Sequence, residues 1–423
     1  VCVAVTAVFG GCMQSAPRDG LNGKDLNIYD LYEAAKLASG NPDMTMSEFL
    51  KEYLSYTSSE LEQAVSLQAA INRSLTSSVS ITSEWNMTLT TEYSNGSGVI
   101  IDVDLEKGDM TVVTNCHVVY SAKATGDGYS DNIKLWLYGS ESAYPVTNEK
   151  NAIEAEIVAT SKSYDIAVLK VENSPKVRQS KATKALWSSG EERYQGETVY
   201  AIGNANGDKI SSSVGYISRD REDIKVNLGT ESNQQVYDYS VLRTSATINS
   251  GNSGGGLYNL DCELAGIVNA KHKDHDTVGY ALPASTVKRV VNSMLSNYGG
   301  VETHGVKVVN HGISVMVTDS YSTGLNDKGF AEIYEEVSIN SVGFAKPLGR
   351  LNRGDIIKHV KIVRPSENDR VVEDLDIMRE HNFYDVMLSV AQGDTVEFTV
   401  MRGGVLSTVS IAFDEENDFK TED

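Results

Sequence analysis

The spacing of hydrophobic and polar residues changes once along the chain. From Ile28 to about residue 78, the apolar residues recur every three or four positions, which is the spacing of one face of a helix. The pattern predicts helices over 28–38, 45–56 and about 59–75. From Val79 onward, short runs with a period of two lie between turns rich in Gly, Asn, Asp and Ser, which is typical of an all-β fold. The chain is therefore predicted to be mainly β, preceded by a short α-helical segment.

The helical segment, residues 27–78, has three interpretations at this point. It can pack on the β-rich part of the chain, mediate the assembly of several copies into a homo-oligomer, or act as a spacer. A docked helical hairpin is the simplest of the three.

The β-rich part divides at a pair of glycines. Residues 79–298 end in a short amphipathic helix over 286–298, and Gly299-Gly300 follows as a hinge. A second β-rich region covers 303–413, and residues 414–423, DEENDFKTED, are predicted to be a frayed acidic tail. A length of 423 residues agrees with two or three domains.

Composition and charge narrow the class of protein. Hydrophobic residues make up 40% of the chain and charged residues 22%, which is enough apolar side chain for packed cores in a globular protein. The net charge of −21 would repel phosphate groups and so argues against a nucleic-acid partner.

The first residues resemble an export signal. Residues 1–12 are uncharged and mostly apolar, and small residues precede Cys12. The stretch is too short to cross a bilayer but suits the hydrophobic part of a signal peptide. A bacterial lipoprotein signal would place a lipid on Cys12 and anchor the protein to a membrane surface. A plain signal peptide and a chance apolar start are the alternatives, and residues 13–26 are interpreted as a linker. Both export signals predict a location outside the cytoplasm.

The cysteines indicate no metal site. None of them has the CxxC spacing of a structural zinc site, so neither a metal nor a cofactor is predicted. Cys116 is expected to pack as a small buried hydrophobe, and a functional thiol or a disulfide with Cys262 are the alternatives.

The first candidate for chemistry is the run Gly251-Asn252-Ser253-Gly254-Gly255-Gly256. A serine hydroxyl is a poor nucleophile until a base takes its proton, and acyl transfer also needs N–H donors aimed at the developing oxyanion. Glycines on both sides of Ser253 allow the tight turn that exposes the hydroxyl and directs two N–H groups to one point. Alone, the run would equally suit a flexible loop.

Two further segments change this balance. His117 follows a strand-like run that begins at Asp109, and Asp165 opens an apolar strand. Each residue alone is better explained as a packed core residue or a turn residue. Together, His117, Asp165 and Ser253 supply a base, an orienting carboxylate and a nucleophile, in the chain order of chymotrypsin.

The chain resembles the HtrA/Deg-type serine proteases, in which a chymotrypsin-like double β-barrel precedes a PDZ domain. The resemblance lies in six ordered motifs: Gly96–Ile100, Thr114–Val119, Asp165–Lys170, Val199–Asn204, Gly251–Leu257 and Gly279–Pro283. It implies a trypsin-like protease domain over 79–298, with the cleft between the two barrels.

Residues 303–413 resemble a PDZ domain. The matching stretches are Asn310–Val315, Gly349–Ile357, Asp385–Leu388 and Gln392–Phe398. The resemblance implies that His311, Gly312 and Ile313 form the loop that holds the C-terminal carboxylate of a peptide, while the peptide adds to a sheet edge. His311 stands where the family usually has an aromatic residue or leucine, so the peptide preference stays open.

The resemblance also implies a role for each residue of the protease site. Ser253 Oγ attacks the scissile carbonyl, His117 takes its proton, and Asp165 orients the imidazole. The backbone N–H groups of Gly251 and Ser253 form the oxyanion hole.

Thr247 and Ile248 are implied to line the primary specificity pocket. Because nothing acidic lies there, we expect cleavage after small or medium apolar residues rather than after Lys or Arg. The expected partners are unfolded or misfolded polypeptides and, for the PDZ domain, peptide C-termini. The alternative function is a chaperone-like or scaffolding protein on a largely resting protease fold.

Overall fold

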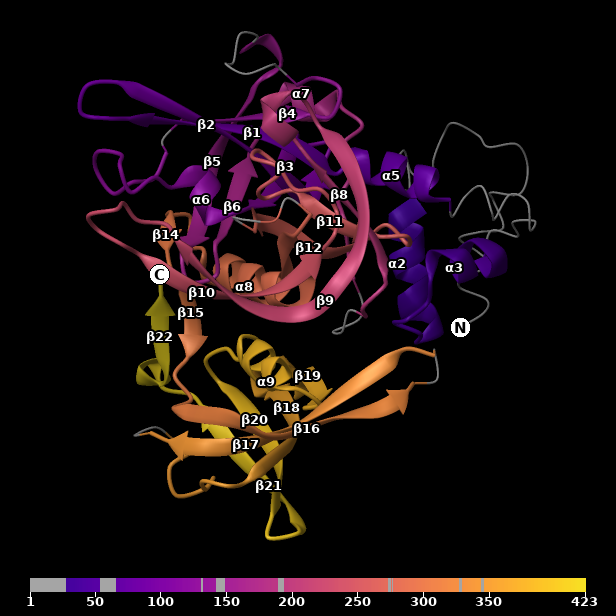
Figure 1. The fold of residues 1–423 in the computed structure, drawn as a ribbon, viewed down its shortest axis with the longest axis vertical. Coiled ribbons are helices and arrows are strands. Elements are labelled where there is room, and N and C mark those ends of the chain that lie inside the picture. The colour runs from indigo at the N-terminus through magenta and orange to yellow at the C-terminus, as the bar shows by residue number, and fades with distance from the viewer. Residues whose placement is uncertain are drawn as a thin grey trace.

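The computed structural model describes residues 28–53, 66–130, 132–141, 149–188, 194–272, 275, 277–326, 329–343 and 346–423. The signal-like stretch with Cys12, the linker at 13–26 and the start of the third predicted helix lie outside the described residues. Strands dominate the described part, and the predicted fold class is confirmed. Two β-barrels are preceded by short helices and followed by a smaller β domain (Figure 1).

The first barrel is an antiparallel sheet closed on itself. Its strands are β1 (Ser78–Asn86), β2 (Thr91–Asp104), β3 (Asp109–Thr114), β4 (Asn132–Leu137), β5 (Ile153–Ser161) and β6 (Ile166–Val171). They follow the order β5-β4-β1-β2-β3-β6, and pairing of β5 with β6 closes the barrel. Ile81, Val112, Leu135 and Leu169 pack together in its core, because alternate residues of each strand point inward.

The second barrel has the same closed arrangement. Its strands are β8 (Thr198–Gly203), β9 (Ser211–Asn227), β10 (Val236–Thr244), β11 (Gly256–Asn259), β12 (Glu263–Lys271) and β13 (Gly279–Pro283). Pairing of β11 with β12 closes the barrel, and the short β7 (Leu186–Trp187) runs parallel to β12. The helix α8 (Ala284–Asn297) follows β13, near the predicted helix over 286–298. The core of the second barrel includes Val199, Ile217, Leu242 and Val268.

The N-terminal helices pack on the second barrel, as the docked-hairpin interpretation expects. They are α2 (Ile28–Ser39), α3 (Met46–Tyr53) and α5 (Leu67–Leu75). Lys36 of α2 forms an ion pair of 2.7 Å with Glu263 of β12, and both side chains are 8% exposed. Ser74 of α5 forms a hydrogen bond of 2.9 Å with Tyr200 of β8. No helix in the described ranges has the length and apolar character needed to cross a membrane.

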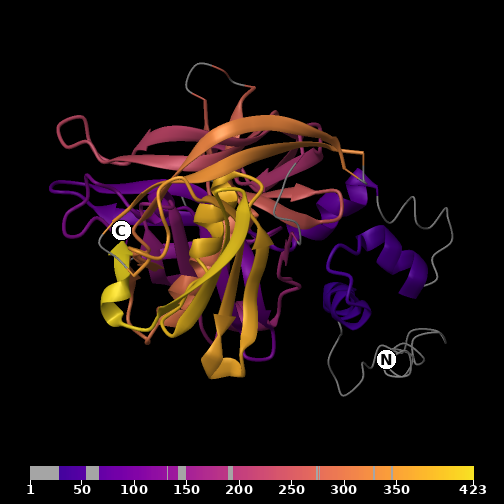
Figure 2. The same ribbon diagram turned by 90° about the horizontal axis from the view of Figure 1, so that it is seen from below.

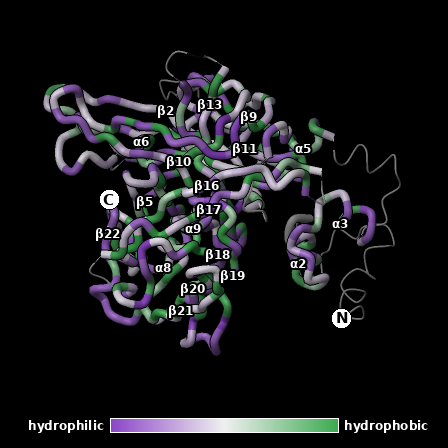
Figure 3. The backbone as a smooth tube through the Cα atoms, turned by 60° about the horizontal axis from the view of Figure 1, so that its bottom comes forward, coloured by the Kyte–Doolittle hydropathy of each residue, from purple (hydrophilic) through white to green (hydrophobic). Residues whose placement is uncertain are grey.

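The second domain is a sheet with one helix against it. Its strands are β16 (Ile313–Leu325), β17 (Ala331–Val342), β18 (Ile356–Arg364), β19 (Arg370–Asp376), β20 (Asp394–Arg402) and β21 (Val405–Phe413). The order is β16-β17-β18-β20-β21, with β19 paired to β18, so β16 forms one edge. Phe383 of α9 (Glu380–Met387) packs with Phe398 and Phe413 in the core. Hydrophobic and hydrophilic positions interchange along these strands and those of the barrels (Figure 3).

One short pairing joins the segment before the second domain's sheet to the first barrel, and a second pairing holds the C-terminal strand. The strand β14 (Thr303–His304) runs parallel to β5, and β15 (Val306–Val309) pairs with β22 (Phe419–Glu422). The expectation of a frayed acidic tail at 414–423 is therefore wrong. Phe419 packs against the core of the second domain, and Lys346 forms an ion pair of 2.8 Å with Asp418. These contacts give the acidic residues partners that their sequence alone does not reveal.

Two ion pairs connect the second domain to the second barrel and to α8. Arg221 of β9 contacts Asp385 of α9 at 2.6 Å, and both side chains are almost fully buried. Arg289 of α8 contacts Glu373 of β19 at 2.9 Å. In two views at right angles, the N-terminal helices lie on the opposite side of the barrels from β22 (Figures 1 and 2).

The Lys36–Glu263 ion pair can be tested by unfolding. Lys36→Met should lower the free energy of unfolding by about 3 kcal/mol, because Glu263 would stay buried without its partner. Lys36→Met/Glu263→Gln should recover most of the loss, because no unpaired charge remains. Urea unfolding followed by circular dichroism measures both variants, and equal losses in the two would contradict the explanation.

Candidate active site

Ser253 lies in the turn between β10 and β11, and two glycines give the turn its shape. Gly251 has φ +91° and Gly254 has φ +84°, a region that residues with a Cβ rarely adopt. A Cβ on Gly254 would lie 2.1 Å from the Thr114 hydroxyl, and one on Gly251 would lie 2.2 Å from the Asn204 carbonyl. The glycine run that the sequence analysis singled out is therefore required by conformation and by close packing.

Ser97 of β2 holds this turn from the other barrel. Its N–H group donates to the Ser253 carbonyl at 2.8 Å, and its hydroxyl donates to the Gly251 carbonyl at 2.6 Å. Both carbonyl groups are thereby fixed away from the space in front of Ser253. Ser97 belongs to a motif that carried the family resemblance, but no site role was predicted for it.

Two N–H groups of the turn, those of Gly251 and Ser253, stay available. Within the described ranges, neither the Gly251 nor the Ser253 amide donates a hydrogen bond to another protein group. Two N–H groups without internal acceptors, beside a serine hydroxyl, can stabilise an oxyanion.

His117 and Asp165 form a direct pair at the edge of the first barrel. His117 lies in α6 (Cys116–Val119), just after β3, and Asp165 immediately precedes β6. His117 Nδ1 is 2.7 Å from Asp165 Oδ2, and the His117 backbone N–H group donates to Oδ1 at 2.9 Å. Asp165 is fully buried, whereas the His117 side chain is 30% exposed. The carboxylate thus fixes the orientation of the ring and leaves Nε2 toward the more open side.

The environment of His117 favours its protonated form. Burial alone lowers the pKa of His117, but the negative charge of Asp165 and its hydrogen bond outweigh this and raise the pKa above the ordinary value. An imidazole held in this way can accept a proton and be stabilised as imidazolium.

Asn269 of β12 links the serine to this pair, and the sequence analysis missed it. Its side-chain Nδ2 donates to Asp165 Oδ2 at 2.6 Å, and its backbone carbonyl accepts from Ser253 Oγ at 3.3 Å. No hydrogen bond between Ser253 and His117 is present in the described part of the chain. In the sequence, the signal for Asn269 was a polar residue within the apolar run that follows Gly266. In the structure, Asn269 is only 2% exposed.

The two predicted pocket residues differ from each other in exposure: Ile248 is buried and Thr247 is exposed. Ile248 is buried, and its side chain packs against Gly279 of β13, where a Cβ would lie 2.4 Å from Ile248 Cγ1. Thr247 is exposed, and its carbonyl accepts a hydrogen bond of 2.8 Å from the Ser213 hydroxyl. Both residues lie on the segment that leads from β10 to Ser253.

The two cysteines within the described residues are both free. Cys116 and Cys262 are buried and form no disulfide with each other. Burial raises the pKa of the Cys116 thiol well above its ordinary value. A buried neutral thiol agrees with the expected packing role.

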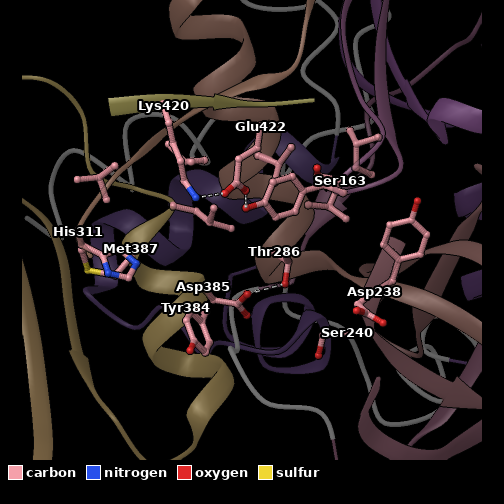
Figure 4. A pocket seen from close by; sticks show the side chains of 18 of the residues that line it. Ser163, Asp238, Ser240, Thr286, His311, Tyr384, Asp385, Met387, Lys420 and Glu422 are labelled. Atoms are coloured by element: carbon pink, nitrogen blue, oxygen red, sulfur yellow. Dashed lines mark hydrogen bonds and ion pairs between the residues drawn. The ribbon is translucent and has the colours of Figure 1, made fainter. Parts of the chain in front are cut away.

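His311, Gly312 and Ile313 lie at the start of β16 in the second domain, apart from the turn that carries Ser253. The Ile313 N–H group donates to His311 Nδ1 at 3.0 Å, and burial lowers the pKa of His311 to about 4. These residues line a cavity of about 490 Å³ between the second domain and the barrels. His311 and Met387 lie at one end of the cavity, and Ser163 lies toward the other (Figure 4).

Comparisons with known proteins agree with this architecture. Residues 96–267 match the trypsin-like peptidase domain family. The chain is 28% identical over 361 residues to the serine protease Do-like HtrA of Bacillus subtilis, covering 83% of this chain and 70% of that protein. It is 32% identical over 211 residues to the periplasmic serine endoprotease DegP of Escherichia coli, covering 49% of this chain and 37% of that protein.

A solved structure shares the fold. The HtrA-type protease AlgW, determined with a tripeptide, matches at a TM-score of 0.51 and 22% identity, over 82% of this chain and 97% of that one. Fold, matched domain and relatives define the protein as a trypsin-like serine endopeptidase. Within that class, the HtrA and DegP relatives support an HtrA-type serine protease.

The link through Asn269 predicts the effect of its removal. Asn269→Ala should slow the labelling of the active-site serine by a fluorophosphonate about tenfold or more, because Asp165 would lose the donor that fixes its carboxylate. Asn297→Ala, at the exposed end of α8, serves as the control and should label like the wild type. Equal labelling rates for all three proteins would contradict a positioning role for Asn269.

Proposed function

We propose that Ser253, His117 and Asp165 are the catalytic residues of an endopeptidase that cleaves unfolded or misfolded polypeptides. The observation that carries the proposal is the His117–Asp165 pair of 2.7 Å, joined through Asn269 to a serine in a glycine turn. A binding protein has no need for this set of groups at one place.

The chemistry follows from the positions of these groups. Ser253 Oγ would attack the carbonyl carbon of the scissile peptide while its proton passes to His117 Nε2. The negative charge that develops on the carbonyl oxygen would be met by the free N–H groups of Gly251 and Ser253. His117 would then give the proton to the leaving amine, and water would release the acyl group by the same steps in reverse.

The substrate preference is proposed from the segment before the serine. Thr247 and Ile248 carry no charge, and Ile248 fills space against Gly279. A pocket limited in this way favours small or medium apolar side chains over Lys or Arg. No metal or cofactor takes part in the proposed steps.

The place of action is proposed to be outside the cytoplasm. The relative from Escherichia coli is named as periplasmic. The apolar stretch before Cys12 fits an export signal, and lipid attachment at Cys12 would hold the protein to a membrane surface.

The second domain is proposed to be a PDZ domain that binds peptide C-termini. Its edge strand β16 and the helix α9 flank the segment His311-Gly312-Ile313, which suits addition of a peptide strand to the sheet edge. In the described state, His311 Nδ1 accepts from the Ile313 amide, one of the groups that would bind the peptide carboxylate. A peptide must therefore displace the imidazole.

Cleavage of unfolded β-casein tests the protease proposal. The purified protein should cleave it near neutral pH without ATP, and Ser253→Ala should show no cleavage, because no other group replaces the nucleophile. Circular dichroism should show the same fold for both proteins. Absence of cleavage by the wild type would contradict the proposal and favour the binding function on a resting fold; cleavage by Ser253→Ala would exclude the assigned nucleophile.

Displacement of His311 can be measured by peptide binding. His311→Ala should bind a labelled peptide with an apolar C-terminal residue about two- to tenfold more tightly, because the Ile313 amide no longer has an internal acceptor. Fluorescence polarisation gives the affinity, and the same peptide with an amidated C-terminus is the control. Equal affinities for wild type and variant would show that His311 does not compete with the ligand.

A further inference from the structure

The turn before Asp165 has a conformation that needs support. Asp165 has φ +48°, which is uncommon for a residue other than glycine, and its N–H group donates to the Lys162 carbonyl at 3.3 Å. Such a conformation persists where the surroundings fix it. The residues Lys162, Ser163 and Tyr164 form the rest of this turn and transmit any outside contact to Asp165.

From the inside, the barrels hold the turn. Tyr239 of β10 donates its hydroxyl to the Lys162 carbonyl at 2.7 Å, and Asn115 Nδ2 donates to the Asp165 carbonyl at 3.0 Å. These bonds fix one side of the turn and leave the outer side of Ser163 and Tyr164 open to other partners.

On the outer side of the turn, residues at the end of β22 contact Lys162, Ser163 and Tyr164. The Tyr164 hydroxyl donates to Glu422 Oε2 at 2.9 Å, and the Ser163 N–H group donates to the Asp423 carbonyl at 2.7 Å. Lys162 Nζ forms an ion pair of 2.6 Å with Asp423 Oδ2. All three residues before Asp165 therefore contact residues more than 250 positions further along the chain. Figure 4 shows Glu422 between Lys420 and the cavity wall near Ser163.

The strand β15 in turn holds β22. Val306↔Glu422 and Val308↔Lys420 are partners in the β15–β22 ladder, and Lys420 forms an ion pair of 2.6 Å with Glu422. The side chain of Glu422 is thereby placed by its own strand before it meets Tyr164.

We propose that Glu422 and Asp423 are positioning residues for Asp165. By fixing the outer side of the turn, they keep the Asp165 carboxylate in line with His117 Nδ1. This inference rests on the proposed function of His117, Asp165 and Ser253, and extends it to the end of β22.

Two features separate this role from general attachment of the domain. The contacts converge on the three residues that precede Asp165 rather than on the barrel surface as a whole. The ion pairs Arg221–Asp385 and Arg289–Glu373 fasten the second domain independently of β22. Loss of the Tyr164–Glu422 bond should therefore change the turn and leave the domain in place.

A double-mutant cycle on Tyr164 and Glu422 tests the inference. Tyr164→Phe and Glu422→Ala should each lower kcat for a short blocked peptide amide about tenfold, with KM nearly unchanged, because the catalytic groups are displaced and substrate binding is not. The double variant should lose no more than either single variant, because both remove the same bond. Glu416→Gln is the matched control, since it removes one negative charge from the same segment without contacting the turn, and should behave like the wild type.

The pH dependence of kcat/KM gives a readout that mere loss of folded protein would not move. Asp165 raises the pKa of His117, and His117 must be neutral to accept the serine proton. When Asp165 moves out of line, this pKa falls, so the acidic limb of the profile should shift to lower pH while the plateau drops. A lower plateau with an unmoved limb, or a wild-type kcat in both single variants, would overturn the inference.

The outcomes for the two proposals are distinguishable. If His117→Ala and Ser253→Ala retain full activity, the proposed function itself fails. If they are inactive while Tyr164→Phe and Glu422→Ala match the wild type, only the positioning role fails.

Discussion

The arrangement of the site depends on a single buried charge. Asp165 has no exposed surface, and an unpaired carboxylate in such a place would cost several kcal/mol. Its oxygens accept hydrogen bonds from His117 twice and from Asn269 once. His117 belongs to the first barrel and Asn269 to the second, so satisfying this charge requires the two barrels to meet at one place. The cleft between the barrels is therefore defined by the same bonds that orient the imidazole.

A second set of bonds across the cleft fixes the nucleophile. Ser97 of the first barrel holds two carbonyl groups of the turn that carries Ser253 in the second. The N–H groups of Asn252 and Gly254, in the same peptide units, donate to the Asn249 and Val268 carbonyls, whereas the amides of Gly251 and Ser253 donate to no protein group in the described part of the chain. Gly254 allows the close approach, since any side chain there would meet Thr114 and Ser97. The polar groups of each barrel thus complete the half of the site carried by the other.

The sequence predicts the parts of this structure that depend on neighbouring residues. Period-two alternation indicates the barrels, and the glycines around Ser253 reflect a local demand on φ. Asn269 and Ser97 escaped prediction because their roles come from partners more than 100 positions away. The acidic residues 414–423 suggested a frayed tail, because charge density in the sequence does not reveal that Lys346 and Lys162 would meet them. The local pattern of hydrophobic and polar residues does not predict contacts between segments that are distant in the sequence.

The segment 159–166 shows why those distant contacts matter for the site. On it converge β14, which pairs with Ala159 and Thr160, and the end of β22, which contacts the turn before Asp165. The cavity of about 490 Å³ reaches the same segment at Tyr164 and Ile166, while its other wall includes His311. A change in how the second domain sits therefore reaches the residues beside the buried carboxylate directly, through the hydrogen bonds of Glu422 and Asp423 to the turn before Asp165.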